Sequence, residues 1–447
     1  MKKVLGLILF LSCFGFTASA QNCNADFLGT KTLYKKGKQK ATPAPARYVP
    51  VFINHVGRHG ARHLTKDVTA SFAYGLLLSK ADSAGALTEK GKKLQQMVIA
   101  LQKVEKGNIK SISAEGVSEL QGISERMFAR YSNVFKGKPN LNVMITKEIR
   151  TKQSADAFLK GLNSKLKETA SINEYTDDTH LRFYDASPAY KRFEDEVDKS
   201  ELTLSLQKKE RLAELNNAVA GRFFKDDFLS RIDAGERSKF VTDVFGFATI
   251  VFSLDKEIKQ AGFNNSDLDF KSLFSCDELS KLSLFDMVDD YLKKGPGTDN
   301  NGIQVRVAVP LLVDFINSAD EYIKTGKYNA CLRFAHAETT APFATLLQIS
   351  TADKVSKDIS KVNAAWKCSG IIPLSSNIQW VFYKKKGTTS YLVKILLNEK
   401  EAHITGLNTR SFPYYKWSDL RALYLTKLSK LNVKLTDDMA SYLTNLK

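Results

Sequence analysis

Short apolar segments alternate with longer amphipathic segments along much of this chain. Some of the apolar segments are rich in β-formers and predict buried strands, at residues 49–55, 141–145 and 328–334. Other segments space their apolar positions as helices do, at residues 87–103, 117–135, 154–167, 305–323 and 340–349. Because strands that alternate with helices are typical of parallel sheets, the pattern predicts an α/β core.

The C-terminal part adds a hairpin and a closing helix to this core. Residues 380–383 and 390–397 predict two strands that turn across Lys386-Gly387-Thr388. Residues 414–428 predict the last helix. Pro342 is expected in the first turn of its helix, where a proline needs no N–H partner.

The middle of the chain, residues 166–300, has a different pattern. Long charge-rich amphipathic segments dominate it, such as residues 202–219 and 238–260, and strand signals are sparse. Gly295-Pro296-Gly297 marks its end. The pattern predicts a mostly helical insertion at residues 166–300, within a core made of residues 21–165 and 301–447.

The first twenty residues have the pattern of a secretory signal peptide. Lys2 and Lys3 give a positive start, an almost wholly apolar run extends to Thr17, and small residues precede a cleavage site after Ala20. This run is shorter than the roughly 20 residues that a membrane-spanning helix needs. We therefore expect a secreted or periplasmic protein that has no membrane span in its mature form.

Export also changes what is expected of the cysteines. Cys13 is lost with the leader, which leaves Cys23, Cys276, Cys331 and Cys368. An oxidising compartment allows up to two disulfides among these four, with three alternative pairings. Their spacing does not match the C-x-x-C pairs of a zinc site.

Positive charge is the unusual feature of the composition. The 447 residues include 66 lysines and arginines against 48 acids, a formal net charge of +18, and loss of Lys2 and Lys3 with the leader leaves +16. The 43% of hydrophobic residues excludes a disordered chain. The charge predicts an anionic partner, either nucleic acid, an acidic surface or a polyphosphorylated small molecule, and export makes nucleic acid a poor candidate.

The densest group of chemically active side chains directly follows the first predicted strand. It contains two arginines and three of the six histidines of the chain, namely Arg58, Arg62, His55, His59 and His63. The i, i+4, i+8 spacing of the histidines suits a metal site only on a helix, and the β-like lead-in and two glycines disfavour one. A chance surface group is also disfavoured, because charges at the end of a buried strand are costly without a counter-charge. No carboxylate is near in sequence, so a bound anion is expected.

Phosphate is the anion that this group fits best. Arginine forks bind phosphate oxygens in pairs. The surrounding positive charge keeps a proton off His59, and a neutral imidazole that faces phosphorus can act as a nucleophile. Such a reaction would form a phosphohistidine and would need an acid to protonate the leaving oxygen.

Two further segments supply candidates for that acid and for phosphate binding. His336 and Glu338 follow the predicted strand at residues 328–334 and open a helix, whose N-terminus favours an anion. Arg150, with Ser154 four residues later, lies between the strand at residues 141–145 and its helix. The C-terminal ends of strands are where α/β sheets hold their ligands.

These motifs resemble those of a known family. Arg58-His59-Gly60-Ala61-Arg62 resembles the Arg-His-Gly-x-Arg signature of the histidine acid phosphatases, the second branch of the histidine phosphatase superfamily. His336-Ala337-Glu338 is similar to the proton-donor motif of the multiple inositol polyphosphate phosphatases, where other members carry His-Asp. Three further segments resemble segments of the same family, at residues 29–32, 150–155 and 181–185, and all the matches appear in the order of the family. The resemblance covers most of residues 27–425.

The resemblance implies a role for each matched residue. His59 would be the nucleophile, and Glu338 would protonate the leaving alcohol and then activate water. The phosphate would be held by Arg58, Arg62, Arg150 and His336. The resemblance further implies a histidine-phosphatase-type α/β core with a helical domain over the site, phytate and lower inositol phosphates as substrates, and no metal or cofactor. We expect a monomer.

The sequence leaves some alternatives open. The family motif usually continues with x-Pro, whereas this chain has His63-Leu64, and His63 either contacts substrate or has a structural role. The chain could instead be a broad acid phosphatase for sugar phosphates or nucleotides. A non-enzymatic alternative is a polyanion-binding module, which would use the basic surface without chemistry.

Overall fold

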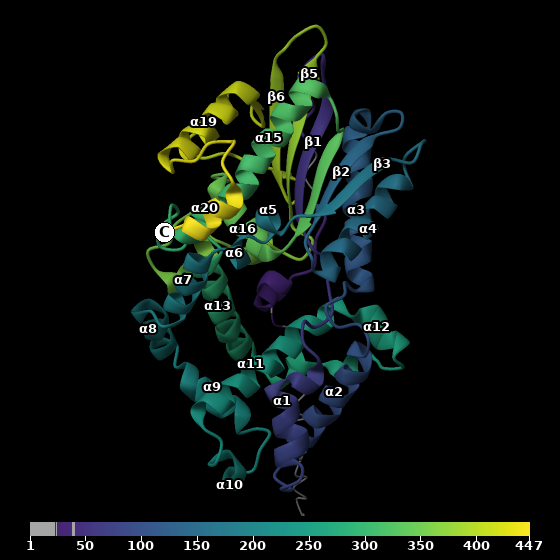
Figure 1. The fold of residues 1–447 in the computed structure, drawn as a ribbon. Helices are drawn as coiled ribbons and strands as arrows, with labels where there is room; N and C mark the ends of the chain where they lie inside the picture. The colour runs from purple at the N-terminus through teal and green to yellow at the C-terminus, as the bar shows by residue number, and fades with distance from the viewer. Residues whose placement is uncertain (1–22, 24, 38–40) are drawn as a thin grey trace, which may run out of the picture.

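A mixed β-sheet forms the centre of the upper part of the molecule in Figure 1. The computed structural model describes residue 23, residues 25–37 and residues 41–447, so the predicted leader at residues 1–20 lies outside the described residues. Parallel strands with helices on both faces confirm the predicted α/β fold class. No helix in the described part of the chain is long and apolar enough to cross a lipid bilayer.

The sheet has eight strands in the order β3-β2-β4-β1-β5-β6-β7, with β8 also paired to β6. Strands β1 to β4 pair in parallel and the others antiparallel. The strands are β1 (Tyr48–Arg58), β2 (Asn140–Ile145), β3 (Ser171–Thr176), β4 (Ala330–Ala335), β5 (Asn377–Lys385), β6 (Tyr391–Leu397), β7 (Lys400–Glu401) and β8 (Tyr414–Lys416). All five predicted strands are present, and β3, β7 and β8 are additional.

Helices cover both faces of the sheet because its central strands are apolar on both sides. On β1, Phe52 and Val56 face one hydrophobic cluster and Ile53 faces another, as the alternation of side chains along a strand requires. Each such fully buried side chain contributes about 1.5–3 kcal/mol. The first face is covered by α15 (Val309–Thr325), α16 (Ala337–Leu346) and α19 (Trp417–Lys430), and the second by α3 (Ala114–Tyr131) and α4 (Ile149–Asn163).

A second, helical part of the molecule lies below the sheet in Figure 1. Its cluster of buried apolar side chains joins residues 68–104 to residues 215–282, so it draws on both sides of the predicted boundary at residue 166. Its helices are α1 (Phe72–Tyr74), a π-helix at Gly75–Ala81, α2 (Glu89–Glu105), α9 (Leu212–Ala220), α10 (Asp226–Leu229), α11 (Ala234–Ile250) and α12 (Asp255–Gln260).

Helix α13 (Cys276–Lys293) connects the two parts. Leu279 and Leu282 near its start belong to the helical cluster, whereas Met287 and Tyr291 near its end belong to the cluster on the sheet. The helix thus runs from the lower part of the molecule up to the helices α6 (Phe183–Ala186), α7 (Pro188–Asp198) and α16 below the sheet, as Figure 1 shows. The other shorter helices are α5 (Asp178–Leu181), α8 (Glu201–Lys209), α14 (Ile303–Arg306), α17 (Val362–Ala365), α18 (Cys368–Ile371) and α20 (Met439–Asn445).

Local caps determine where several helices begin. Thr88 accepts a hydrogen bond from the third residue of α2, and Ser275 forms a capping box with Glu278 at the start of α13. The predicted helix at residues 202–219 is divided, because Arg211 adopts a left-handed conformation between α8 and α9. Pro342 lies inside α16, not in its first turn as expected, because the helix already begins at Ala337.

One disulfide joins the start of the described chain to α13. Cys23 and Cys276 are bonded across a sequence separation of 253 residues, whereas Cys331 and Cys368 are buried free thiols. This selects one pair from those that the sequence left open. A cross-link of this kind typically contributes about 2–4 kcal/mol to the free energy of unfolding.

Candidate active site

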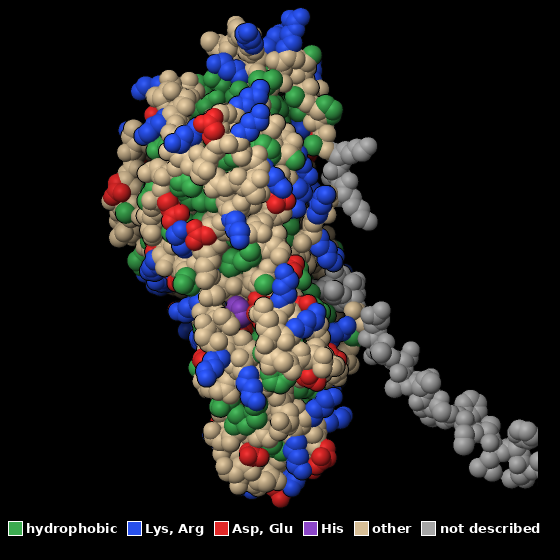
Figure 2. All heavy atoms as spheres, turned by 90° about the vertical axis from the view of Figure 1, so that its right-hand side faces the viewer, with side chains coloured by type: hydrophobic (Ala, Val, Ile, Leu, Met, Phe, Trp, Pro, Cys, Tyr) green, Lys and Arg blue, Asp and Glu red, His purple; other side chains and the backbone are tan. Residues whose placement is uncertain are grey.

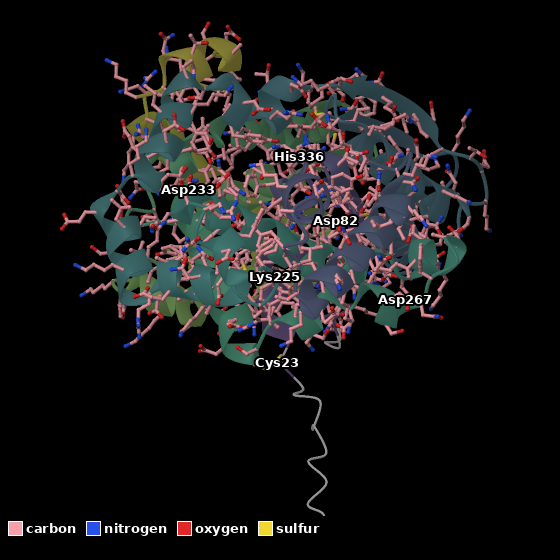
Figure 3. All side chains as sticks on the ribbon, turned by 90° about the horizontal axis from the view of Figure 1, so that it is seen from below. Cys23, Asp82, Lys225, Asp233, Asp267 and His336 are labelled. Carbon is pink, nitrogen blue, oxygen red and sulfur yellow. A yellow bond between two sulfur atoms is a disulfide. The ribbon has the colours of Figure 1, made fainter. Side chains whose placement is uncertain are left out.

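The C-terminal ends of three neighbouring strands bring most of the predicted site residues together. Strand β4 lies between β2 and β1, and all three are parallel. Arg58 at the end of β1 stands opposite Ala335, and Ile145 at the end of β2 stands opposite Phe334. The segments that follow these strands therefore start at one edge of the sheet, where α/β proteins hold their ligands. Figure 3 views the molecule from the helical end, and His336 lies well inside its outline.

His59 is fixed directly after β1 by hydrogen bonds of its own backbone. Its N–H donates to the Ala335 carbonyl at 2.9 Å, and its carbonyl accepts from the N–H of Ser375 at 3.0 Å. The ring atom Nδ1 lies 3.0 Å from the Gly60 carbonyl, which can only accept, so Nδ1 carries the proton. The other ring nitrogen, Nε2, then holds the lone pair that a nucleophile needs.

Burial and positive charge keep His59 neutral. Burial lowers the pKa of His59 well below its ordinary value, and the positive charges of Arg58 and Arg62 lower it further. A neutral imidazole is the nucleophilic form. The environment therefore favours the role of nucleophile that the sequence analysis predicted.

The loop around His59 is packed tightly against α3. Glu119 of α3 accepts hydrogen bonds from the Ala61 N–H at 3.0 Å, the Ser375 hydroxyl at 2.7 Å and the Tyr34 N–H at 2.7 Å. A Cβ atom on Gly60 would come within 2.8 Å of the Gly116 Cα atom, so no side chain fits there. The sequence analysis did not single out Glu119, which fixes three segments around the loop.

Backbone carbonyls orient Arg58 and Arg62. The Nη1 atom of Arg58 donates to the carbonyls of Thr30 at 2.6 Å and Ile372 at 2.7 Å, while its buried Nε has no partner among the described residues. Arg62 donates to the His63 carbonyl at 2.7 Å. Hydrogen bonds to carbonyls hold a guanidinium in place without neutralising it, so both groups suit an anion.

Arg150 and His336 contact each other across the ends of β2 and β4. The Nη2 atom of Arg150 lies 3.2 Å from Nδ1 of His336. Because arginine can only donate, Nδ1 accepts this hydrogen bond. The proton is then on Nε2, which lies 3.0 Å from the hydroxyl of Thr146. Burial, followed by the charge of Arg150, lowers the pKa of His336 to about 3 and keeps it neutral. Glu148, which the sequence analysis did not single out, binds the other terminal nitrogen of Arg150 at 2.9 Å.

Glu338 lies in the first turn of α16 and is paired with a lysine. Lys294, directly after α13, has its Nζ atom 3.1 Å from Glu338 and 2.7 Å from Asp290. Burial alone would raise the pKa of Glu338, but the groups around it, Lys294 first among them, together outweigh burial and lower the pKa well below its ordinary value. The sequence analysis missed Lys294, although the Gly295-Pro296-Gly297 segment that it noted is the turn that directs this lysine.

The imidazole of His63 contacts carboxylates of the helical part and not the other candidate site residues. Its Nδ1 atom is 3.1 Å from Glu105 on α2, and its Nε2 atom is 3.9 Å from Glu257 on α12. The imidazole is almost wholly buried. Both ring nitrogens thus face carboxylates of the helical part, which are partners of the kind that a structural role needs, and the substrate contact stays a prediction.

The arrangement as a whole suits transfer of a phosphoryl group. The rings of His59 and His336 have their centroids 5.6 Å apart, Arg150 contacts His336, and the charges of Arg58, Arg62 and Arg150 all act on His59. Glu338 is close enough to His336 and Arg58 for their charges to affect its pKa. In the described part of the chain, no group of three or more His, Cys, Asp or Glu side chains is arranged to hold a metal ion. Ser154 links two of the segments, because it accepts from the Gly60 N–H at 3.1 Å and donates to the Arg150 carbonyl at 2.6 Å.

Comparisons with known proteins find similarity over most of the chain. The family described as the histidine phosphatase superfamily (branch 2) matches residues 51–398. A curated relative, multiple inositol polyphosphate phosphatase 1 from Gallus gallus, is 22% identical over 427 residues. The match covers 89% of this chain and 89% of the relative.

Solved structures share the fold. The multiple inositol polyphosphate phosphatase of Bifidobacterium longum, in complex with inositol hexasulfate, matches with a TM-score of 0.76 at 18% identity over 89% of this chain and 97% of its own. The phytase of D. castellii matches with a TM-score of 0.66 at 14% identity over 95% of this chain and 91% of its own.

Proposed function

The chain belongs to branch 2 of the histidine phosphatase superfamily, and from this premise we propose that it hydrolyses phytate and other inositol polyphosphates through a phosphohistidine. The observation that carries the proposal is the position of His59: a neutral imidazole with Nδ1 bonded to a carbonyl, among Arg58, Arg62 and Arg150. Such a group can attack phosphorus while the arginines hold the phosphate oxygens.

The reaction would proceed in two steps. Nε2 of His59 attacks phosphorus, the P–N bond forms, and the P–O bond to the alcohol breaks while Glu338 gives a proton to the leaving oxygen. Water then attacks the phosphohistidine with Glu338 as the base, the P–N bond breaks, and phosphate leaves. A bound phosphate dianion raises the pKa of the nearby His336, so that Nδ1 of His336 can gain a proton and donate to a phosphate oxygen.

Two observations support a polyphosphorylated inositol as the substrate. The Gallus gallus relative and the Bifidobacterium longum structure are both named as multiple inositol polyphosphate phosphatases. The net charge of +18 also favours a highly anionic substrate, and Figure 2 shows lysines and arginines spread over both parts of the molecule on the face in view. Such a field increases the encounter rate with a polyanion more than with a monophosphate.

The test compares phytate with glycerol 2-phosphate at equal concentration, with and without EDTA. We expect faster phosphate release from phytate, and no loss of rate with EDTA because His59 needs no metal to act as a nucleophile. A clear preference for glycerol 2-phosphate would favour a broad acid phosphatase instead. Loss of activity with EDTA, restored by a divalent cation, would contradict the proposed mechanism.

We also propose that the protein is exported and cleaved after Ala20. The leader pattern supports this, and so does the disulfide between Cys23 and Cys276, since such bonds persist mainly in oxidising compartments. N-terminal sequencing of the protein from the culture fluid or a periplasmic extract is expected to start at Gln21. An intact Met1 on protein retained inside the cell would contradict export.

A further inference from the structure

Lys294 occupies a position that the proposed mechanism does not explain. Its Nζ atom bridges Asp290, one turn earlier in α13, and Glu338 at the start of α16. The neighbouring backbone fixes it there, because the N–H of Gly295 donates to the carbonyls of Asp290 and Tyr291. The side chains of Lys294 and Glu338 are 16% and 34% exposed, so both remain accessible from the site.

The pair opposes the chemistry that Glu338 is proposed to perform. A general acid must carry its proton when the alcohol leaves. Among the described residues, Lys294 is the ion-pair partner of Glu338, at 3.1 Å, and the largest influence that favours its charged form. Glu338 therefore becomes an effective acid only after the influence of Lys294 has been weakened.

The other charged groups around the pair do not remove this conflict. Arg58 also favours the charged form of Glu338, and His336 does so when its ring is protonated, while Asp290 holds Lys294 from the other side. The remaining ionisable groups that affect the pair come from the Arg62 loop and from α6, α7 and α13, and they are Arg62, Tyr184, Tyr190, Glu194, Asp286 and Asp289.

We propose that Lys294 is a specificity-determining residue, whose ammonium moves from Glu338 to a second phosphate of the substrate, next to the phosphate that reacts. The proposal rests on the proposed function and adds to it a preference for neighbouring phosphates. An ammonium on a flexible stem suits this exchange, because it can turn from a carboxylate to a phosphate. Phytate carries a phosphate on every ring carbon, so a neighbour is always present.

The exchange links substrate choice to proton transfer. Once Lys294 binds the second phosphate, Glu338 loses its main cationic partner and takes up a proton from water. Glu338 then gives this proton to the leaving oxygen, which keeps the electron pair of the broken P–O bond. A substrate with a single phosphate leaves Lys294 on Glu338 and reacts more slowly.

The test measures kcat/KM from pH 4 to 8 for phytate and for inositol monophosphate, in the full mature chain and in Lys294→Met. For phytate, kcat/KM is expected to fall about tenfold or more, since a charge-assisted hydrogen bond is lost. For the monophosphate, kcat/KM at neutral pH is expected to rise, because Glu338 without Lys294 keeps its proton to higher pH. The alkaline limb of this profile should move up by about 1–3 pH units.

Lys293→Met is the matched control. Lys293 is the neighbouring lysine, and its ion pairs are with Asp198 and Asp289, whereas Glu338 is paired with Lys294. This variant is expected to keep the substrate preference of the unmodified chain. Lys294→Gln, a smaller polar change, is measured beside Lys294→Met, and Lys294→Arg is expected to recover most of the preference for phytate.

Two results would overturn the proposal. The first is an equal loss for both substrates in well-folded Lys294→Met and Lys294→Gln, which would indicate a structural role. The second is an alkaline limb that stays in place for the monophosphate. Failure of the proposed function is a separate result, because the unmodified chain would then release no phosphate from phytate, while the pH profile on the monophosphate still tests the contact between Lys294 and Glu338.

Discussion

Replacement of His59 with alanine is expected to lower phosphate release from phytate by at least about 10³-fold. His59 is the only imidazole in the described site whose Nδ1 is held by a carbonyl, which leaves Nε2 to attack phosphorus. The other histidine there, His336, uses Nδ1 to accept from Arg150 and Nε2 to contact Thr146. It is therefore not oriented to replace His59. Steady-state phosphate release measures the effect.

The phosphohistidine itself gives a second readout for His59. Rapid mixing with labelled substrate, followed by a denaturing quench at alkaline pH, is expected to give label on the unmodified chain and none on His59→Ala. His403→Ala is the matched control, because His403 is exposed and its ring contacts that of Phe412, not a residue of the candidate site. Activity of His59→Ala within tenfold of the control would rule out His59 as the nucleophile.

The sequence was sufficient to predict the strands that are buried on both faces. Residues 49–55, 141–145 and 328–334 are apolar because β1, β2 and β4 lie in the centre of the sheet. Strand β3 gave no such signal, because all its side chains are exposed at the edge of the sheet. The sequence pattern carries no signal that residues 68–104 share a hydrophobic cluster with residues 215–282, because α1 and α11 contact each other only through the packing of distant segments.

Some residues of the candidate site could likewise be predicted from the sequence, and others could not. Residues that directly follow a central strand, such as His59 and His336, could be found because the strand predicts where they lie. Lys294 could not, because in sequence it is the second of two adjacent lysines at the end of a charged helix. Only the turn after α13 directs Lys293 to Asp198 and Lys294 to Glu338.

Replacement of Glu338 with glutamine is expected to lower kcat for phytate by about 10²–10⁴-fold, because glutamine cannot give a proton to the leaving alcohol. The same variant should lose much less activity on 4-nitrophenyl phosphate, whose phenolate leaves without a proton. Glu214→Gln is the matched control, because Glu214 is exposed and pairs only with Arg211 on the described surface. Equal losses on both substrates would mean that Glu338 positions the phosphate and is not the acid.

The pH dependence separates these roles further. An acid works only while protonated, so kcat/KM of the unmodified chain for a monophosphate should fall as the pH rises through the pKa of Glu338 in the free enzyme. That pKa lies below its ordinary value because Lys294 and the other groups around Glu338 together outweigh the effect of burial, so the fall should begin at acidic pH. Glu338→Gln has no proton to lose at this position, and its slower reaction should therefore lack this limb. A limb that persists unchanged in Glu338→Gln would assign the titration to another group and remove Glu338 from the role of the acid.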